Sequence, residues 1–201
     1  LVAESRGRTE VVATGDGPFT GNLDLARLEA LPVDRVKFLF VDAMAEGYKP
    51  VGLDHLKRLQ DWCAARRKFL VLDLSNGLAA ADLQRQHTPA LRERPLMEIV
   101  RMMADLADVI VFDLAEDARG KIGGFIAAKP FPVFEACRNE VVVYEGLHTY
   151  GGMTGRAMAI GAQGLRELVK EEQAEWILQQ VDLFASLLEA EKVPLHRGAN
   201  G

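Results

Sequence analysis

Runs of consecutive apolar residues alternate along most of the chain with segments in which leucines recur at helical spacing. Short continuous apolar runs are typical of strands buried on both faces, whereas spacings of three and four residues predict helices. The predicted strands lie at 10–14, 36–41, 69–72, 109–112, 125–128, 141–144 and 193–195. Helices are predicted at 22–31, 53–63, 96–106, around 134–137, and over the residues that run up to 192. Helices between β-branched strands predict an α/β fold, with three layers (α/β/α) around a mainly parallel sheet.

Three of the predicted strands run directly into polar segments, at 42–44, 73–76 and 113–116. In sheets of this class, ligands bind outside the carboxyl ends of the strands. We therefore expect the residues of any binding site at these three strand ends.

The predicted elements divide the chain into two parts. Residues 1–165 form a central α/β domain, and residues 166–201 form a long helix that leads into a second, smaller domain, most of which is missing. The sequence begins with Leu1 rather than Met, so we interpret it as a fragment or as a protein whose natural ends are not represented.

Composition excludes several classes of protein. The 201 residues are 49% hydrophobic and 26% charged with a formal net charge of −5, which excludes disordered and fibrous architectures. The mild acidity argues against a nucleic-acid surface, and no apolar run approaches the ~20 residues of a bilayer-spanning helix. Cys63 and Cys137 fall on helix-like patterns, which favours free thiols and a cytoplasmic location. His55, His87 and His196 are scattered, so no metal site is predicted.

Four blocks of sequence are similar to one enzyme family. They are Pro-Phe-Thr-Gly-Asn-Leu-Asp-Leu at 18–25, Leu-Ala-Asp at 106–108, Ile-Gly-Gly-Phe-Ile-Ala at 122–127, and Glu-Gly-Leu-His-Thr-Tyr-Gly-Gly at 145–152 followed by Gly155, Arg156 and Met158. Together they resemble tryptophanase and tyrosine phenol-lyase, the pyridoxal-phosphate-dependent β-eliminating lyases of the aspartate aminotransferase fold. The resemblance covers nearly the whole chain but only the central part of a family member. It implies the large domain of that fold and a dimer with active sites between its subunits.

The resemblance also implies a change at the reactive position. A pyridoxal-phosphate enzyme needs a lysine amine to hold the cofactor as a Schiff base. In the family this lysine lies six residues before the Ile-Gly-Gly-Phe strand, a position that is Glu116 here, and its neighbour, a lysine that helps to hold the phosphate, is Ala115. Lys121, five residues further on, could be a displaced Schiff-base lysine, although a solvated lysine is the commoner case.

Of the other positions in the family's cofactor site, some match the family and others are replaced. Asp73 matches the carboxylate that pairs with the pyridinium nitrogen, and Ser75 replaces a threonine conservatively. By the same comparison Asn76 replaces an arginine and Met44 replaces the asparagine near the pyridine oxygen. Tyr150 matches the family. The resemblance therefore implies relic cofactor-binding positions without a complete site.

Two further groups offer alternative chemistry. His148, where the family usually has proline, could be a replacement acid or base, although a surface histidine is the simpler interpretation. Asp113, Glu116 and Asp117 could form an acid/base pair with shifted pKa values, but a solvated acidic loop is favoured.

The sequence thus predicts a catalytically degenerate lyase relative, a pseudoenzyme that acts by binding a small amino-acid-like ligand or a partner protein. No cofactor is expected, and pyridoxal phosphate is expected only if Lys121 or a partner chain supplies the amine. The alternative is a working enzyme, either a pyridoxal-phosphate lyase or a cofactor-free catalyst built on Asp73, Glu116 and His148, with Tyr150 as a further candidate. A homodimer, or a heteromer with a complementary subunit, is the expected assembly.

Overall fold

A four-stranded sheet forms the centre of the computed structural model, which describes residues 17–32, 36–45, 49–146 and 151–195. Its strands are β1 (Phe38–Asp42), β4 (Phe69–Asp73), β5 (Val109–Asp113) and β6 (Gly124–Ala128), in the order β1-β4-β5-β6. The first three are parallel and β6 is antiparallel to β5. A separate two-stranded sheet pairs β2 (Met44–Ala45) with β3 (Lys49–Pro50). The predicted fold class, α/β with a mainly parallel sheet, is confirmed.

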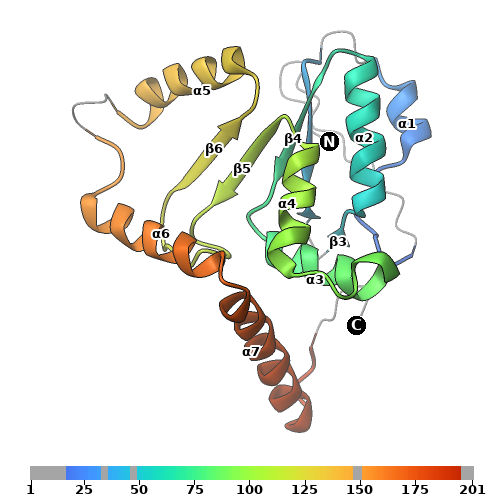
Figure 1. Cartoon of the computed structure of the whole chain (residues 1–201), viewed down its shortest axis with the longest axis vertical. Coiled ribbons are helices and arrows are strands. Elements are labelled where there is room, and N and C mark those ends of the chain that lie inside the picture. Colours follow the sequence, from blue (N-terminus) through green and yellow to red (C-terminus); the bar gives the residue numbers. More distant parts are fainter. Residues whose placement is uncertain (1–16, 33–35, 46–48, 147–150, 196–201) are drawn as a thin grey trace.

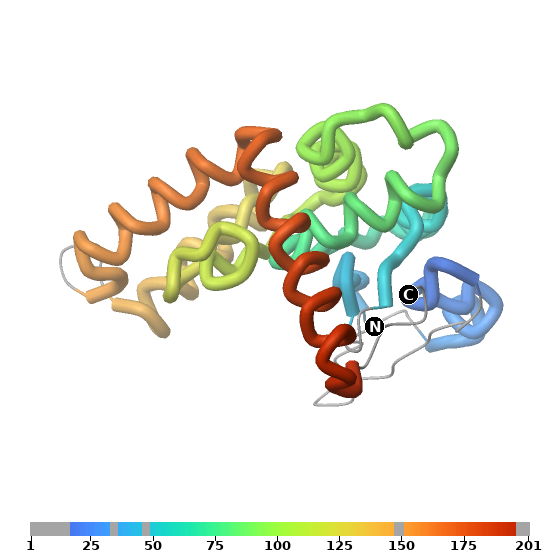
Figure 2. The backbone as a smooth tube through the Cα atoms, turned by 90° about the horizontal axis from the view of Figure 1, so that it is seen from below, coloured from blue at the N-terminus to red at the C-terminus, as the bar shows by residue number. Residues whose placement is uncertain are grey.

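Helices connect the strands (Figure 1). They are α1 (Leu25–Ala30), α2 (Leu53–Ala65), α3 (Gly77–His87), a 3-10 turn (Pro89–Leu91), α4 (Leu96–Leu106), α5 (Phe131–Tyr144), α6 (Gly155–Leu168) and α7 (Glu171–Ala190). In both views α2, α3 and α4 lie together on one side of the sheet (Figure 1, Figure 2). Helices α5 and α6 lie near opposite ends of β6, and α7 extends away from the sheet (Figure 1).

The core lies between the sheet and these three helices. Alternate residues of β1 and β4, such as Leu39, Val41, Leu70 and Leu72, are buried against Leu56, Leu59, Ile99, Met103 and other side chains of the helices. The strands therefore alternate between buried and partly exposed positions, although continuous apolar runs predict burial on both faces. Helices α2, α3 and α4 therefore form a helical layer against this face of the sheet.

Several predicted elements differ from the structure. Residues 141–144 are the last turn of α5 rather than a strand, and 193–195 form no strand. The long predicted helix is two helices, which break at Val169 and Lys170. The predicted strand at 10–14 lies outside the described residues, and the division into domains at residue 165 stays a prediction.

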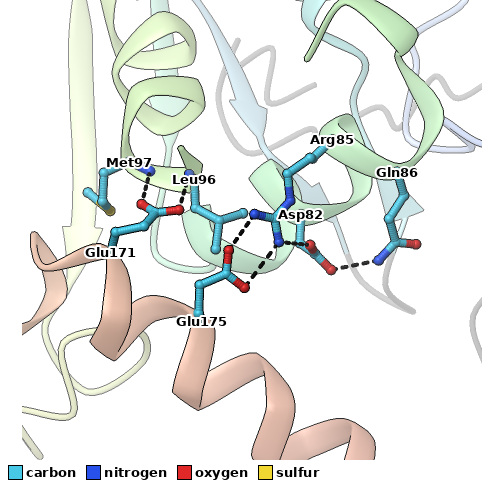
Figure 3. Close-up of polar contacts among 7 residues, drawn as sticks. All are labelled: Asp82, Arg85, Gln86, Leu96, Met97, Glu171 and Glu175. Atoms are coloured by element: carbon cyan, nitrogen blue, oxygen red, sulfur yellow. Dashed lines mark hydrogen bonds and ion pairs between the residues drawn. The ribbon is translucent and has the colours of Figure 1, made fainter. Parts of the chain in front are cut away.

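Polar contacts attach α7 to the rest of the fold (Figure 3). The Glu171 carboxylate accepts hydrogen bonds from the N–H groups of Leu96 (2.7 Å) and Met97 (3.4 Å). It therefore caps the start of α4, where the N-cap residue is Pro95 and offers no side-chain acceptor. One turn along α7, Glu175 pairs with Arg85 of α3, which also donates to Asp82 at 2.9 Å. None of the helices in the described part of the chain has the length and apolar character to cross a membrane.

Candidate ligand-binding site

Three aspartates end three neighbouring strands at the carboxyl edge of the sheet. Asp42 ends β1 and lies directly beside Asp73, the last residue of β4. Asp113 ends β5, two residues beyond Val111, which is the register partner of Asp73. Paired residues and residues two apart along a strand point to the same face. The sheet thus brings all three carboxylates to one face of one edge, as the sequence predicted for these strand ends.

Ser75 connects two of these strand ends. Its N–H and hydroxyl both donate to Asp73 Oδ1, at 2.9 and 2.5 Å. The same hydroxyl accepts a hydrogen bond from the Asp113 N–H at 2.9 Å. These bonds fix the orientation of the Asp73 carboxylate, and they give Ser75 a structural role that sequence comparison alone did not indicate.

Among these three aspartates, Asp42 has a raised pKa. Burial, together with the neighbouring negative charge of Asp73, raises its pKa from 3.8 to about 6. The N–H of Met44 donates to Asp42 Oδ1 at 2.9 Å, which opposes part of this shift. Two adjacent carboxylates that repel each other favour the approach of a cation to this edge.

Asp117 is not part of a solvated acidic loop, so that prediction is wrong for this residue. Its Oδ2 accepts a hydrogen bond from the Leu78 N–H at 2.7 Å, in the first turn of α3. The N-cap residue of α3, Asn76, makes no side-chain capping bond, and Asp117 provides the cap from 39 residues away in the sequence. Burial raises its pKa to about 6, with a smaller contribution from Glu116. No local sequence signal indicates a cap that comes from a distant loop.

The remaining predicted positions lie around this edge. Glu116 and Ala115 are exposed in the loop between β5 and β6, as expected for an acidic loop. Lys121 lies in the same loop and is also exposed, with a backbone φ of 67°. Met44 is buried and lies in β2.

Two candidates cannot be placed, and no metal cluster is present in the described part of the chain. His148 and Tyr150 lie outside the described residues, so their proposed roles stay predictions. His55 is a core residue, because its Nε2 accepts the Leu23 N–H at 3.0 Å and burial lowers its pKa. Among the residues that the structure describes, no three His, Cys, Asp or Glu side chains are grouped to hold a metal ion.

The comparisons with known proteins identify relatives of the chain. No family model matches it. It is 33% identical to the probable tryptophanase of Aeropyrum pernix over 189 residues, which cover 92% of this chain and 40% of that protein. It is 28% identical to the tyrosine phenol-lyase of Nostoc punctiforme, over 85% of this chain and 38% of that protein. The chain is homologous to tryptophanases and tyrosine phenol-lyases. It spans about two fifths of the length of these relatives.

Solved structures confirm the fold. A putative L-allo-threonine aldolase from Listeria monocytogenes superposes with a TM-score of 0.54 at 15% identity, over 77% of this chain and 38% of that one. A putative aromatic amino acid β-eliminating lyase/threonine aldolase from Exiguobacterium gives a TM-score of 0.53 at 17% identity, over 80% of this chain and 42% of that one.

These relatives overturn the expectation that no cofactor is involved. Tryptophanases and tyrosine phenol-lyases are pyridoxal-phosphate-dependent enzymes, so the cofactor of this group of proteins is pyridoxal phosphate. The residue that the resemblance puts at the Schiff-base position, Glu116, is an exposed carboxylate in the loop between β5 and β6, and a carboxylate does not fit covalent attachment of the cofactor. The start of α3, where backbone N–H groups could otherwise bind a phosphate, is capped by Asp117.

Proposed function

We propose that this chain is the central segment of a β-eliminating-lyase-like protein that binds an amino-acid-like ligand at the carboxyl edge of the sheet, without forming a Schiff base through its own loop. The proposal is supported by the resemblance, which puts Glu116 where the family has its Schiff-base lysine, and by the Asp73 carboxylate, whose Oδ1 accepts two hydrogen bonds from Ser75. A carboxylate cannot form an imine with an aldehyde, because it has no nitrogen.

The electrostatics of the edge favour a cationic group in the ligand. Burial raises the pKa of Asp42, and the charge of Asp73 adds to this effect. Asp42, Asp73 and Asp113 end adjacent strands, so a bound ammonium or pyridinium group would offset the repulsion between them. An amino acid offers such an ammonium group. Its carboxylate would need a cation that the three aspartates do not provide.

The cation that a ligand carboxylate needs would come from another subunit of the assembly. We propose a homodimer, or a heteromer with a complementary subunit, in which the second subunit supplies cationic groups to this edge. The free thiols of Cys63 and Cys137 favour action in the reducing cytoplasm.

A second candidate function is an active pyridoxal-phosphate lyase. The observations in its favour are the retained Asp73 and the homology to enzymes that use this cofactor. In that case the amine comes from Lys121, which is exposed in the loop beside the edge, or from a partner subunit.

Titration with pyridoxal phosphate, L-tryptophan and L-tyrosine tests the proposal. We expect L-tryptophan or L-tyrosine to bind in calorimetry, and Asp73→Asn to weaken that binding by about 10-fold, or about 1.4 kcal/mol. Asp61→Asn, on the exposed surface of α2, is the matched control and leaves the affinity unchanged. Absence of binding by both amino acids contradicts the proposal, and binding of pyridoxal phosphate alone favours the second candidate function described above.

Borohydride reduction separates the two candidate functions. We expect no stoichiometric adduct after pyridoxal phosphate is added and reduced. A single adduct mapped to Lys121, and lost in Lys121→Ala but not in the control Lys57→Ala, establishes the active enzyme instead. Lys57 is an exposed lysine of α2 and therefore measures non-specific modification.

A further inference from the structure

A cavity of about 410 Å³ lies between the C-terminal half of α3, the 3-10 turn that follows it and α7. Its lining contains an ion-pair network in which Arg85 binds both Asp82, at 2.9 Å, and Glu175 (Figure 3). The side chains of Arg85 and Asp82 are only 21% and 20% exposed, so this part of the lining is held in place. Cavities of this volume are typical of sites for small molecules.

Two further charged side chains line the cavity. Arg92 directly follows the 3-10 turn, and Asp182 lies on α7. Within the part of the chain that the structure describes, neither the Arg92 guanidinium nor the Asp182 carboxylate forms a hydrogen bond or an ion pair. Both residues are exposed. The cavity therefore offers a cationic and an anionic group to a ligand.

Asp182 continues a row of carboxylates along α7. Glu171, Glu175 and Asp182 follow one another at spacings of four and seven residues, so they lie on the same face of the helix. Glu171 binds the start of α4 and Glu175 pairs with Arg85 of α3, whereas Asp182 lines the cavity. A ligand bound to Asp182 would therefore extend the attachment of α7 beyond its first two turns.

The charges of the lining indicate the class of ligand. The carboxylates of Asp82, Glu175 and Asp182 outnumber the guanidinium groups of Arg85 and Arg92, which disfavours a purely anionic ligand. A purely cationic ligand would leave the Arg92 guanidinium beside a second positive charge. A zwitterion satisfies both groups, with its carboxylate on the Arg92 fork and its ammonium group on Asp182.

The neutral groups of the lining indicate what else the ligand carries. The Gln179 amide forms no hydrogen bond to any described residue, and Gln86 donates its Nε2 to Asp82 at 2.6 Å. The Gln86 Oε1 accepts no hydrogen bond from the described residues. Leu178 adds an aliphatic surface. Two amides and a leucine match a short polar side chain without charge.

We propose that this cavity is an additional binding site, for a free α-amino acid with a neutral polar side chain such as glutamine. The bound amino acid links the 3-10 turn to the middle of α7. The cavity is formed by the C-terminal half of α3, whereas Asp73 precedes the start of that helix. The proposal is therefore independent of whether the strand ends bind a ligand.

Calorimetry on the full chain with L-glutamine tests the proposal. Two analogues, N-acetyl-L-glutamine and L-glutaminamide, each lack one of the two charges. We expect L-glutamine to bind and each analogue to bind about 10-fold more weakly, because each leaves Asp182 or Arg92 without its partner. Absence of L-glutamine binding, or equal binding of the two analogues and L-glutamine, overturns the proposal.

Substitutions locate the bound amino acid. We expect Arg92→Gln and Asp182→Asn each to weaken L-glutamine binding about 10-fold, with an unchanged circular dichroism spectrum because both positions are exposed. Arg94→Gln is the matched control, since it removes an exposed guanidinium outside the cavity and leaves the affinity unchanged. Binding that Asp73→Asn weakens, and that neither cavity variant weakens, places the ligand at the strand ends and overturns this proposal alone.

Hydrogen exchange measures the effect of the ligand on α7. At saturating L-glutamine, we expect exchange over residues 178–190 to slow about 5-fold, because the ligand adds contacts beyond those of Glu175. In Asp182→Asn at the same concentration, exchange should not slow. No slowing in the parent chain, or equal slowing in both proteins, overturns the proposed link to α7.

Discussion

Gln84 is a fully buried polar side chain of α3 and joins two parts of the fold at the scale of a single residue. Its Nε2 donates to the Val51 carbonyl at 2.7 Å, and its Oε1 accepts from the Leu53 N–H at 3.0 Å. The amide thus satisfies both backbone groups at the entry to α2. Buried polar groups without partners are costly, so this residue is important for stability.

We expect Gln84→Leu to lower the free energy of unfolding by about 2–4 kcal/mol, because the buried Val51 carbonyl and the partly buried Leu53 N–H both lose their partner. Urea denaturation followed by circular dichroism measures the change. Gln86→Leu, an exposed position of the same helix, is the control and should alter stability by less than about 0.5 kcal/mol. Equal effects of the two substitutions would contradict the proposed role.

At the scale of single residues, the sequence indicates some residues of the candidate site but not others. Asp73 is identifiable because it ends an apolar run, and strand ends are where ligands bind in such sheets. Asp117 looks like one more residue of an acidic loop, and its role depends on a hydrogen bond to Leu78 across 39 positions. Local patterns contain no information about such a pairing.

At the scale of elements, α5 shows how a correct pattern leads to a wrong assignment. Val141 to Val143 are β-branched and predict a strand, but a short apolar run is equally compatible with a helix segment. In the structure they continue the helix that begins at Phe131, and none of its residues is buried. A short apolar run that is not buried can form either a strand or a helix, so the residues before it, which are helical from Phe131 on, decide its conformation.

Helix α7 is attached to α4 and α3 by the contacts of Glu171 and Glu175, and the prediction at the scale of elements tests this attachment. We expect Glu171→Ala combined with Glu175→Ala to increase hydrogen exchange over residues 171–190 by about 5-fold, which corresponds to about 1 kcal/mol, because α4 loses its cap and Arg85 loses a partner. Exchange in β1 and β4 should be unchanged. Mass spectrometry of the peptides measures both.

Glu172→Ala is the control for this experiment. Glu172 lies in the same first turn of α7 but is exposed. If it increased exchange as much as the double substitution, the effect would reflect helix propensity and the attachment through Glu171 and Glu175 would be refuted.

At the scale of the whole molecule, the two raised carboxyl pKa values make stability depend on pH. Asp42 and Asp117 titrate near 6 in the folded chain and near 3.8 when unfolded. A raised pKa in an acid means that the folded state retains a proton that the unfolded state has released. The contribution of each group is therefore fully present below pH 3.8 and is lost as the pH rises through 6.

We expect the double variant Asp42→Asn, Asp117→Asn to gain stability relative to the parent as the pH rises from 4 to 7. Asparagine keeps the oxygen that accepts from Met44 or Leu78 and removes the charge. The gain at pH 7 should be on the order of 1–2 kcal/mol after allowance for solvent screening, and urea denaturation at several pH values measures it.

His55 is the same in both proteins, so its opposite contribution, which is lost as the pH falls below 6.5, cancels in the difference. A difference that does not vary with pH would show that the two carboxyl groups are ionised alike in the folded and unfolded chains.

The sequence by itself determined the α/β class, the mainly parallel sheet and the polar strand ends at Asp42, Asp73 and Asp113, and its resemblance to the lyases puts Glu116 at the lysine position. These features follow from the spacing of apolar residues along the chain and from the identity of single residues, which are local properties. Only the tertiary structure decided that Asp117 caps α3, that Gln84 of α3 hydrogen-bonds backbone groups at the start of α2, and that 141–144 is helical. Each of these depends on which distant segments lie side by side, and that is settled by packing of the whole chain.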